Sequence, residues 1–368
     1  MTTGTSASTP TGTIEAYVHS VTWGGPDVLI VELRPVTGAF PKASAGSHID
    51  IHLPVDGRDA IRQYSLINSD ATPQRYLIAV FREPQSRGGS RLIHDVLRVG
   101  HIVDISAPRN TFSLARGDHH TVGGRHVLLG GGIGVTPLAA MAQHLVGVGE
   151  EFDLHTYAST RRDAPLAEYI GSVLAPAAAP VSAPAAEPVS APAAARVPAS
   201  HTAQSAWHQH YSDEEPSFRT ATALPREYQP GDHVYICGPT GFIDHAVAVA
   251  RDTGWPEDTI HVERFQLSEP VDTTGEAFEV VAHSTGERMP VGEQQTITEV
   301  LADHGYHVEL SCEQGICGSC ITGVVSGVPD HRDEVQSEAE HQANTQINVC
   351  CSRSRSAELV LDLKCWIR

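Results

Sequence analysis

The stretch Cys312-Glu-Gln-Gly-Ile-Cys317-Gly-Ser-Cys320 brings three cysteines together in one short segment, and Cys350 follows after a gap of 29 residues. Six of the seven cysteines of the chain lie between residues 312 and 368, and the seventh is Cys237. An odd number of thiols clustered in this way does not suit a disulfide framework. The pattern indicates ligation of a metal ion or of a metal cluster.

The spacing C-x4-C-x2-C with a distant fourth cysteine is typical of plant-type [2Fe–2S] clusters. Gly315 and Gly318 lack side chains, so backbone N–H groups of the loop can approach the inorganic sulfides and tune the potential. A zinc site is the alternative, but structural zinc prefers cysteines two residues apart or cysteine–histidine pairs. The predicted cluster ligands are Cys312, Cys317, Cys320 and Cys350.

The cysteine next to the fourth ligand needs a separate interpretation. Cys350 and Cys351 are adjacent, and neighbouring residues of a strand point to opposite faces, so only one of them can be a ligand. We expect Cys351 and Cys365 to be packed thiols.

Residues 268–368 form a small unit of mixed structure around this loop. Paired strands are expected at 277–283 and 288–291, a short helix at 296–304, and further strands at 345–349 and 358–363. We expect an α+β plant-type ferredoxin domain of the β-grasp type.

Residues 114–267 alternate strands with helices, the pattern of an α/β doubly wound parallel sheet. Strands are expected at 126–129, 153–158, 208–211, 233–237 and 260–262, with a helix at 137–146. Residues 175–198 interrupt this unit with an Ala/Pro-rich repeat, because the heptapeptide PVSAPAA at 180–186 recurs at 188–194. Such a segment cannot bury a core, so we expect a flexible insertion.

Two glycine-containing motifs of this unit indicate a dinucleotide site. Gly130-Gly131-Gly132-Ile133-Gly134 stands at a strand-to-helix junction, where glycine lets a pyrophosphate approach the backbone, and Cys237-Gly238-Pro239 ends a later strand. Ligands of doubly wound sheets sit at the carboxyl ends of strands, where both motifs fall. Each motif alone is weak, and Cys237 could equally be a small buried strand-end residue.

Residues 14–113 contain many short strand-like runs, at 28–33, 48–53, 63–67, 76–81 and 101–106, which favours an antiparallel β-barrel or sandwich. The first thirteen residues are expected to be disordered. Within the strand-rich region, Arg62-Gln63-Tyr64-Ser65-Leu66 could bind a flavin. Tyr64 could lie against the isoalloxazine ring, Arg62 could neutralise a phosphate, and Ser65 could hydrogen-bond the flavin. The alternative is an ordinary strand with a surface arginine and a half-buried tyrosine.

A second stretch, Arg87-Gly88-Gly89-Ser90, precedes a helix expected at 92–97, with Ser90 as the expected N-cap. Glycines before a helix N-terminus leave N–H groups free to bind an anion, and Arg87 adds positive charge. The terminal phosphate of FMN would fit such a site. A flexible turn with a capping serine is the alternative.

Taken together and in this order, the motifs resemble the phthalate dioxygenase reductase family, which includes vanillate O-demethylase reductases and supplies electrons to Rieske non-haem iron oxygenases. The resemblance covers about residues 14–368 apart from the insertion. It rests on RQYSL at 62–66, RGGS at 87–90, GGIGVTPL at 131–138, CGP at 237–239, HVERF at 261–265 and the cysteine loop at 312–320.

The resemblance implies three domains in one chain, an antiparallel β-barrel flavin domain, an NAD domain and a ferredoxin, with site residues in each. The residues implied at the reacting groups are Ser65, Cys237 and Phe265, of which Phe265 could also be a core phenylalanine. Those implied to hold FMN and NADH are Arg62, Tyr64, Ser65, Arg87, Gly89, Ser90, Gly132, Thr136, Gly238 and Pro239. Two arginines in Ser159-Thr160-Arg161-Arg162 could accept a 2′-phosphate, so NADPH is an alternative to NADH.

NADH delivers two electrons together as a hydride, whereas a [2Fe–2S] cluster accepts one, so a flavin must stand between them. The expected path is hydride transfer from nicotinamide C4 to flavin N5, two single-electron steps to the cluster, and delivery to an oxygenase. One alternative is another acceptor, such as a cytochrome P450. A second is a non-enzymatic carrier or redox sensor, which predicts no NADH turnover. A self-contained hydroxylase is not expected, because no spacing of two histidines and a carboxylate stands out.

The chain carries 44 acidic residues against 25 Lys and Arg, a formal charge of −19. Such a surface repels nucleic acid and anionic lipid and suits docking to a basic partner, although acidity can also serve solubility alone. The sequence has no apolar stretch of about 18 residues, and residues 1–13 lack the basic and apolar segments of a signal peptide. We therefore expect a cytoplasmic protein without a membrane span, and the resemblance implies a monomer.

Overall fold

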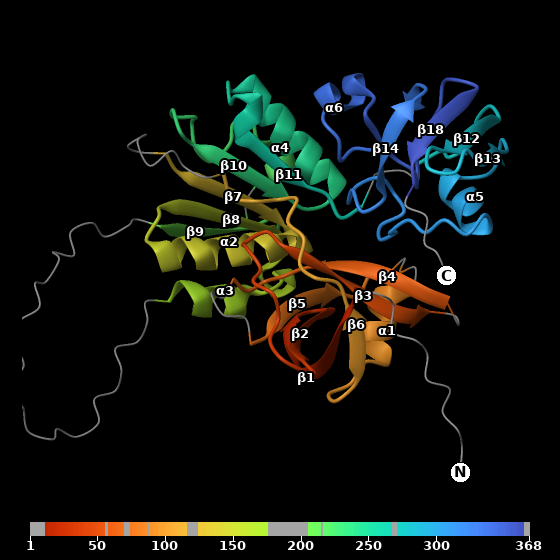
Figure 1. Ribbon diagram of the computed structural model, residues 1–368. Coiled ribbons are helices and arrows are strands. Elements are labelled where there is room, and N and C mark those ends of the chain that lie inside the picture. The colour runs from red at the N-terminus through yellow and green to blue at the C-terminus, as the bar shows by residue number, and fades with distance from the viewer. Residues whose placement is uncertain are drawn as a thin grey trace, which may run out of the picture.

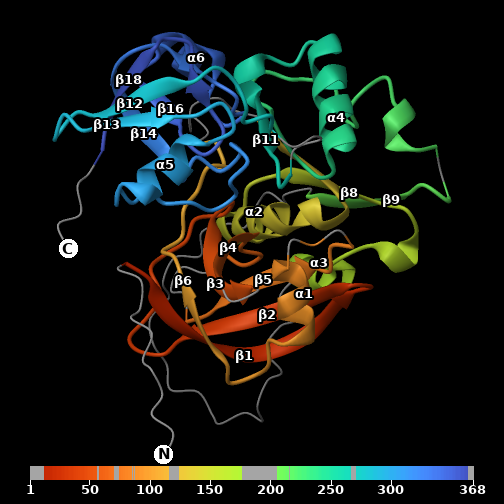
Figure 2. The same ribbon diagram turned by 90° about the vertical axis from the view of Figure 1, so that its right-hand side faces the viewer.

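The computed structural model describes residues 12–55, 58–69, 74–84, 86, 88–115, 124–175, 205–214, 216–266 and 271–363. The expected disordered N-terminus and the Ala/Pro-rich insertion therefore lie almost entirely outside the described residues, as does Cys365. Three large sheets follow one another along the chain, and a small two-stranded sheet falls within the residue range of the third. Figures 1 and 2 show the corresponding units meeting in the middle of the molecule.

The first sheet is a six-stranded antiparallel barrel in the order β4-β3-β6-β1-β2-β5. A bridge between Leu66 and Ile78 joins its two edges. Apolar side chains such as Val18, Leu33 and Ile49 fill the interior. The strands are β1 (Ile14–Gly25), β2 (Val28–Pro35), β3 (His48–Val55), β4 (Arg58–Ser65), β5 (Tyr76–Phe81) and β6 (Ile102–Ile105), and the short helix α1 (Gly89–Asp95) packs beside β3 and β5.

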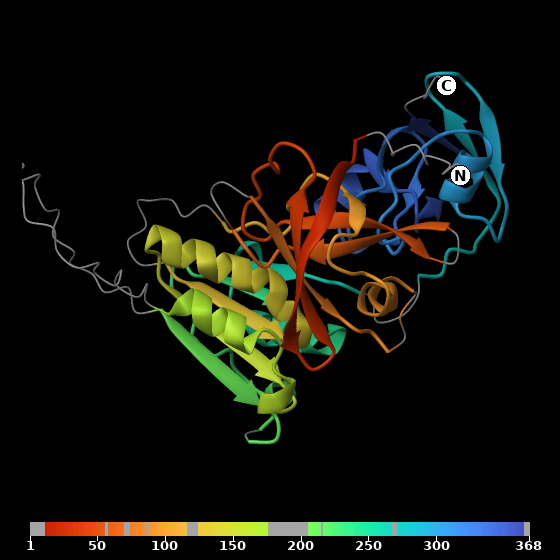
Figure 3. The same ribbon diagram turned by 90° about the horizontal axis from the view of Figure 1, so that it is seen from below.

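The second sheet is parallel, with the order β11-β10-β7-β8-β9. The helices α2 (Val135–Val148) and α3 (Ala167–Leu174) cover the face towards the barrel, and α4 (Thr240–Asp252) covers the other face (Figures 1 and 3). The strands are β7 (His126–Gly131), β8 (Phe152–Ala158), β9 (Ala206–Tyr211), β10 (His233–Cys237) and β11 (Ile260–Glu263). Short 3-10 turns stand at η1 (Gly132–Gly134), η2 (Arg161–Asp163), η3 (Phe218–Thr220) and η4 (Glu257–Thr259).

The third sheet is mixed, with the order β13-β12-β18-β14-β16. Its first strand, β12 (Phe278–Ala282), pairs in parallel with its last, β18 (Glu358–Asp362), and all other pairs are antiparallel. The remaining elements are β13 (Arg288–Val291), α5 (Ile297–Asp303), β14 (Ile321–Ser326), β15 (Pro329–Asp330), α6 (Glu338–Ala343), β16 (Gln346–Asn348) and β17 (Arg353–Ser354). This is the α+β fold expected from the sequence.

One expected detail of the barrel is wrong. Ser90 is not the N-cap of α1, because Gly88 takes that position with a φ of 96° and no side chain caps the helix. The hydroxyl of Ser90 donates instead to Ser86, at 3.0 Å. None of the helices in the described ranges is long and apolar enough to cross a membrane.

Candidate functional site

A cavity of about 490 Å³ lies where the three units meet. Its walls come from β4 and β5, the start of α1, the first turn of α2, the segment at the end of β11 and the cysteine loop. The sequence-predicted residues that line it are Arg62, Tyr64, Ser65, Gly89, Ser90, Thr136, Phe265 and Cys312. The fold thus brings motifs for three different cofactors to a single space.

The barrel wall of the cavity is formed by β4. Arg62 and Tyr64 are two residues apart on this strand and therefore face the same side. Burial raises the pKa of the Tyr64 phenol, although Arg62 opposes the shift, so the side chain is a neutral O–H donor. Ser65 ends the strand and is only 7% exposed.

The two barrel motifs fit against each other. A Cβ on Gly89 would lie 2.5 Å from Cγ of Arg62, and a Cβ on Gly88 would lie 2.3 Å from Cγ1 of Val55. Glycine at both positions therefore lets the start of α1 close over Arg62. The amide of Glu83 donates to the Ser90 hydroxyl at 3.2 Å, which fixes that side chain at the cavity wall. Arg87 lies outside the described residues.

The two nucleotide motifs also meet, at the carboxyl ends of the adjacent parallel strands β7 and β10. A Cβ on Gly134 would lie 2.5 Å from the carbonyl of Cys237 and from the amide of Gly238. A Cβ on Gly131 would lie 3.1 Å from the ring of Pro239. The hydroxyl of Thr136 donates to the carbonyl of Ile133 at 3.0 Å and so holds the first turn of α2 against the cavity.

Cys237 does not line the cavity among the described residues. Its side chain is fully buried in the apolar core between the barrel and the parallel sheet. Burial, together with the neighbouring Glu263, raises the pKa of the thiol well above its usual value. In the structure, Cys237 is therefore a small buried residue at the end of a strand, which was the alternative interpretation of this cysteine. Gly132 borders a separate small pocket beside Thr156 and Trp207.

Glu263 is a cavity residue that sequence reasoning missed. Its Oε2 is buried and has no hydrogen-bond partner among the described residues. Burial raises its pKa to about 8, and the neighbouring Ser65 offsets only part of this shift. Its position could have indicated a role, because Glu263 stands at the carboxyl end of β11, where ligands of such sheets bind. In the sheet it is paired with Cys237.

The four predicted cluster ligands lie together. Cys317 and Cys350 perturb the pKa of the Cys312 thiol, and Cys312 and Cys320 perturb that of Cys350, as expected of close neighbours. Each is at most 8% exposed, and the six cysteines in the described ranges are all free of disulfides. The bond with Cys312 and burial raise the pKa of the Cys317 thiol. Neutral thiols crowded in this way fit an iron centre, which takes them as thiolates.

The loop around these thiols requires its glycines. Gly315 and Gly318 have φ values of 75° and 71°, a region that residues with a Cβ rarely adopt. A Cβ on Gly315 would also lie 2.6 Å from Sγ of Cys351, the fifth thiol of the group. Cys351 is 1% exposed, and the neighbouring Cys350 lowers the pKa of its thiol.

The barrel contacts this loop directly. The Ser311 hydroxyl donates to Asp50 at 2.9 Å, and Arg109 pairs with Asp50 while donating to Ser319 at 3.1 Å. These bonds hold the loop beside the cavity, whose wall includes Cys312.

The arginine pair considered for a 2′-phosphate lies beyond β8. Arg161 pairs with Glu214 at 3.2 Å and lies over the ring of Tyr211, at 4.6 Å from its centroid. Its positive charge is therefore already compensated within the chain.

Comparison with known proteins extends these observations. A family described as a 2Fe-2S iron-sulfur cluster binding domain matches residues 280–355. A vanillate O-demethylase oxidoreductase of Pseudomonas sp. (strain HR199 / DSM 7063) is 38% identical over 351 residues, which cover 95% of this chain and 100% of that protein. A phenoxybenzoate dioxygenase subunit beta of Ectopseudomonas oleovorans is 34% identical, over 97% of this chain and 100% of that protein.

Two solved structures are also similar. Phthalate dioxygenase reductase, described as a modular structure for electron transfer from pyridine nucleotides to [2Fe–2S], is 30% identical with a TM-score of 0.62, over 96% of this chain and 98% of that one. An intact type IV self-sufficient cytochrome P450 monooxygenase is 29% identical with a TM-score of 0.75. The match covers 95% of this chain but only 41% of the P450 chain.

A flavin-type barrel, a nucleotide sheet and a ferredoxin sheet around one cavity define a nucleotide-dependent flavin iron–sulfur oxidoreductase, which transfers electrons. Relatives that are 30% or more identical in sequence match nearly the whole chain and show its family. The chain belongs to the phthalate dioxygenase reductase family. The multidomain fold and the enzymatic interpretation made from the motifs are confirmed.

Proposed function

We propose that this reductase takes electrons from NADH, passes them through FMN and a [2Fe–2S] cluster, and delivers them one at a time to a Rieske-type aromatic oxygenase. The observation that carries the proposal is the composition of one cavity wall. It includes Tyr64 and Ser65 of the barrel, Thr136 and Phe265 of the nucleotide unit, and Cys312 of the cysteine loop. A cofactor held there would be in reach of both the electron donor and the cluster.

The barrel side of the cavity suits a flavin, which when bound supplies the conversion of a two-electron donor into single-electron steps. Tyr64 and Ser65 would hold the ring, and Arg62, Gly89 and Ser90 the phosphate. FMN is proposed because α1 closes on Arg62, where a terminal phosphate would meet a guanidinium group and a hydroxyl. Phosphodiesterase treatment of the released flavin tests this, since fluorescence rises for FAD and stays constant for FMN.

The nucleotide side of the cavity includes Thr136, with Phe265 as an aromatic wall. Gly132, Gly238 and Pro239 at the neighbouring strand ends are proposed as further nucleotide contacts. NADH is proposed over NADPH because Arg161 is already paired with Glu214. Cys237 would act on the nicotinamide only through its backbone, since its thiol is buried in the core.

Glu263 is proposed to hold a proton at the cavity. With a pKa of about 8 it is neutral at pH 7, and it lines the cavity together with Ser65. A neutral carboxyl group here avoids a negative charge beside a flavin that must accept a hydride.

For the cluster, Cys312, Cys317, Cys320 and Cys350 are proposed as the ligands, with Cys351 as a packed neighbour. We also propose boundaries that give a flavin domain at 14–113, a nucleotide domain at 114–267 and a ferredoxin domain at 268–368, in keeping with the three sheets. We further propose that the chain acts in the cytoplasm and, as the resemblance implies, as a monomer.

The oxygenase partner is proposed from the relatives. Proteins named vanillate O-demethylase oxidoreductase and phenoxybenzoate dioxygenase subunit beta match along their whole lengths. A second candidate acceptor is a cytochrome P450, favoured by the structural match to the self-sufficient P450 chain. Reduction assays with a purified Rieske oxygenase and a purified P450 separate the two, because only the cognate acceptor should sustain NADH oxidation.

The decisive test of the electron path is an anaerobic visible spectrum before and after addition of NADH. Flavin bands and an iron–sulfur envelope, both bleached by stoichiometric NADH, are the expected result. A cluster that NADH does not reduce would contradict the proposed path.

A further inference from the structure

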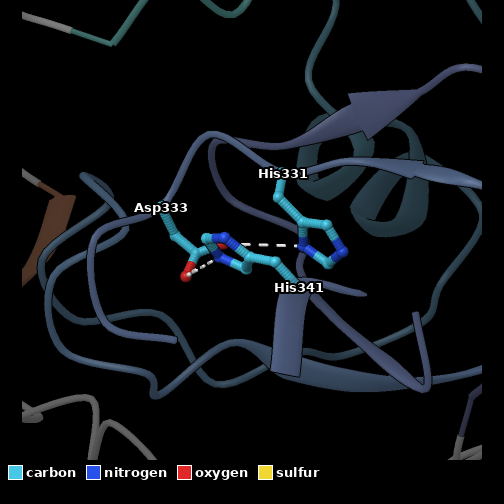
Figure 4. A group of neighbouring side chains, drawn as sticks. All are labelled: His331, Asp333 and His341. Atoms are coloured by element: carbon cyan, nitrogen blue, oxygen red, sulfur yellow. Dashed lines mark hydrogen bonds and ion pairs between the residues drawn. The ribbon is translucent and has the colours of Figure 1, made fainter. Parts of the chain in front are cut away.

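The ferredoxin unit contains a second group of metal-ligating side chains, separate from the cysteines. His331 follows β15, Asp333 lies in the next loop, and His341 lies in α6 (Figure 4). Their spacing in the sequence does not stand out, and only the fold brings them together. Figure 4 shows the carboxylate of Asp333 pointing towards both imidazole rings.

The distances within this group suit a metal ion. Nε2 of His341 lies 3.3 Å from Oδ2 of Asp333, and Nδ1 of His331 lies 3.8 Å from Oδ1. One ligand atom from each residue can be chosen so that all three lie within 4.8 Å of one another. Two ligand atoms on a tetrahedral zinc ion, with bonds of about 2.0–2.1 Å, are ~3.4 Å apart.

Two buried atoms of the group lack a partner among the described residues, namely Nδ1 of His331 and Oδ1 of Asp333. The Asp333 side chain is 0% exposed and the His331 side chain 8% exposed. These atoms face each other at a distance too long for a hydrogen bond. Buried polar atoms are rarely left in this way without a water or an ion.

The surroundings orient both ligands. Nε2 of His331 lies 3.2 Å from Oδ1 of Asn344, an acceptor, so Nε2 carries the hydrogen and Nδ1 presents a lone pair towards Asp333. The amide of Gln336 donates to Oδ2 of Asp333 at 3.0 Å. Ligating histidines commonly have their second nitrogen held by such an outer partner.

The two imidazoles are stacked, with centroids 4.4 Å apart and planes 19° apart. We propose that His331, Asp333 and His341 bind one divalent transition-metal ion, for which Zn²⁺ fits the donor set. A water molecule would complete the coordination.

The ion would fasten the segment 331–341 against the cysteine loop. A Cβ on Gly315 would lie 2.9 Å from Cα of Asp333, and the amide of Glu334 donates to the carbonyl of Gly315 at 3.0 Å. The proposed site therefore supports the loop that carries Cys312 and Cys317.

The test is calorimetric titration of the holoprotein with Zn²⁺, after dialysis against a chelator and with the iron–sulfur absorbance unchanged. We expect one binding site per chain. His341→Ala removes the most exposed ligand and should weaken binding at least about 100-fold. Asn344→Gly removes the outer partner of His331 at a position with a φ of 51° that glycine tolerates, and should weaken binding about 10- to 100-fold.

The matched control is His304→Ala, a histidine of the same unit paired with a single carboxylate, Glu287, at 2.8 Å. It should leave binding unchanged. Absence of saturable Zn²⁺ binding in the wild type would overturn the proposal. Equal binding by the wild type and His341→Ala, with the iron content of both intact, would overturn it as well.

Discussion

The carboxylate of Asp50 accepts a hydrogen bond of 2.9 Å from the hydroxyl of Ser311, although the two residues are 261 positions apart in the chain. Asp50 belongs to barrel strand β3, and Ser311 directly precedes Cys312. Arg109 extends the contact to Ser319, near the other end of the cysteine loop. The flavin-type barrel therefore holds both ends of the loop that is proposed to carry the cluster.

Replacement of Ser311 by alanine should slow electron transfer between the proposed flavin and cluster. Loss of a buried hydrogen bond to a charged group costs about 1.5–3 kcal/mol, which would lower the population of the docked loop. Stopped-flow absorbance with NADH should show an unchanged flavin phase and a cluster phase slower by about tenfold. Ser284→Ala is the control, because this hydroxyl of the same unit is bonded to the carbonyl of Leu363 among the described residues. Equal cluster phases in both variants would argue against this role.

Adjacent cysteines allow a direct test of the fourth ligand. Cys350→Ser should lose most of the iron and the red-brown absorbance, because serine replaces a thiolate ligand. Cys351→Ser should keep the iron and the absorbance. The two cysteines are similarly buried, at most 5% exposed, so burial alone would not cause a difference between the variants. Iron analysis per chain decides, and the reverse pattern would assign Cys351 as the ligand.

Glu263 should make flavin reduction depend on pH. Since its pKa is raised to about 8, the side chain is neutral below that pH and negatively charged above it. The charge would oppose hydride arrival, so we expect the rate to fall about threefold to tenfold as the pH rises from about 7 to 9. Glu263→Gln should flatten this profile, while the exposed Glu227→Gln should not. An unchanged profile in Glu263→Gln would exclude this carboxyl group as the cause.

Gly134→Ala tests the contact between the two nucleotide motifs. The added Cβ would lie 2.5 Å from backbone atoms of Cys237 and Gly238, so the strand ends must separate. Overpacking of this kind costs about 1–3 kcal/mol, and we expect the KM for NADH to rise by about tenfold or more. Gly147→Ala in α2 meets no atom within 4 Å and should leave the KM unchanged. Steady-state kinetics with a fixed acceptor measure both, and equal KM values would contradict the assignment.

The sequence predicted those parts of the fold that depend on local pattern. Strands β5 and β10 follow from alternation or from short apolar runs bounded by turn residues, and the cysteine spacing identified the ferredoxin unit. The start of α1 was predicted too late in the chain. The helix begins at Gly89, after Gly88 as its N-cap, and the positive φ of Gly88 cannot be read from composition.

The properties that depend on packing could not be predicted in this way. The raised pKa of Glu263 arises from burial, and the burial of Cys237 arises from its place in the core between two units. The bond between Ser311 and Asp50 joins separate sheets, so no sequence window contains it. Local sequence pattern can indicate candidate site residues. Their burial, their pKa values and their contacts with other units depend on the assembled fold.

The parallel pairing of β12 with β18 sets an order of events during synthesis. The ribosome makes every strand of the barrel and of the parallel sheet before β12, so those two units can fold early. The third sheet cannot close until β18, its last strand, has been made. Iron can therefore be inserted into a completed ferredoxin sheet only after the described strands of the barrel and of the parallel sheet have been made.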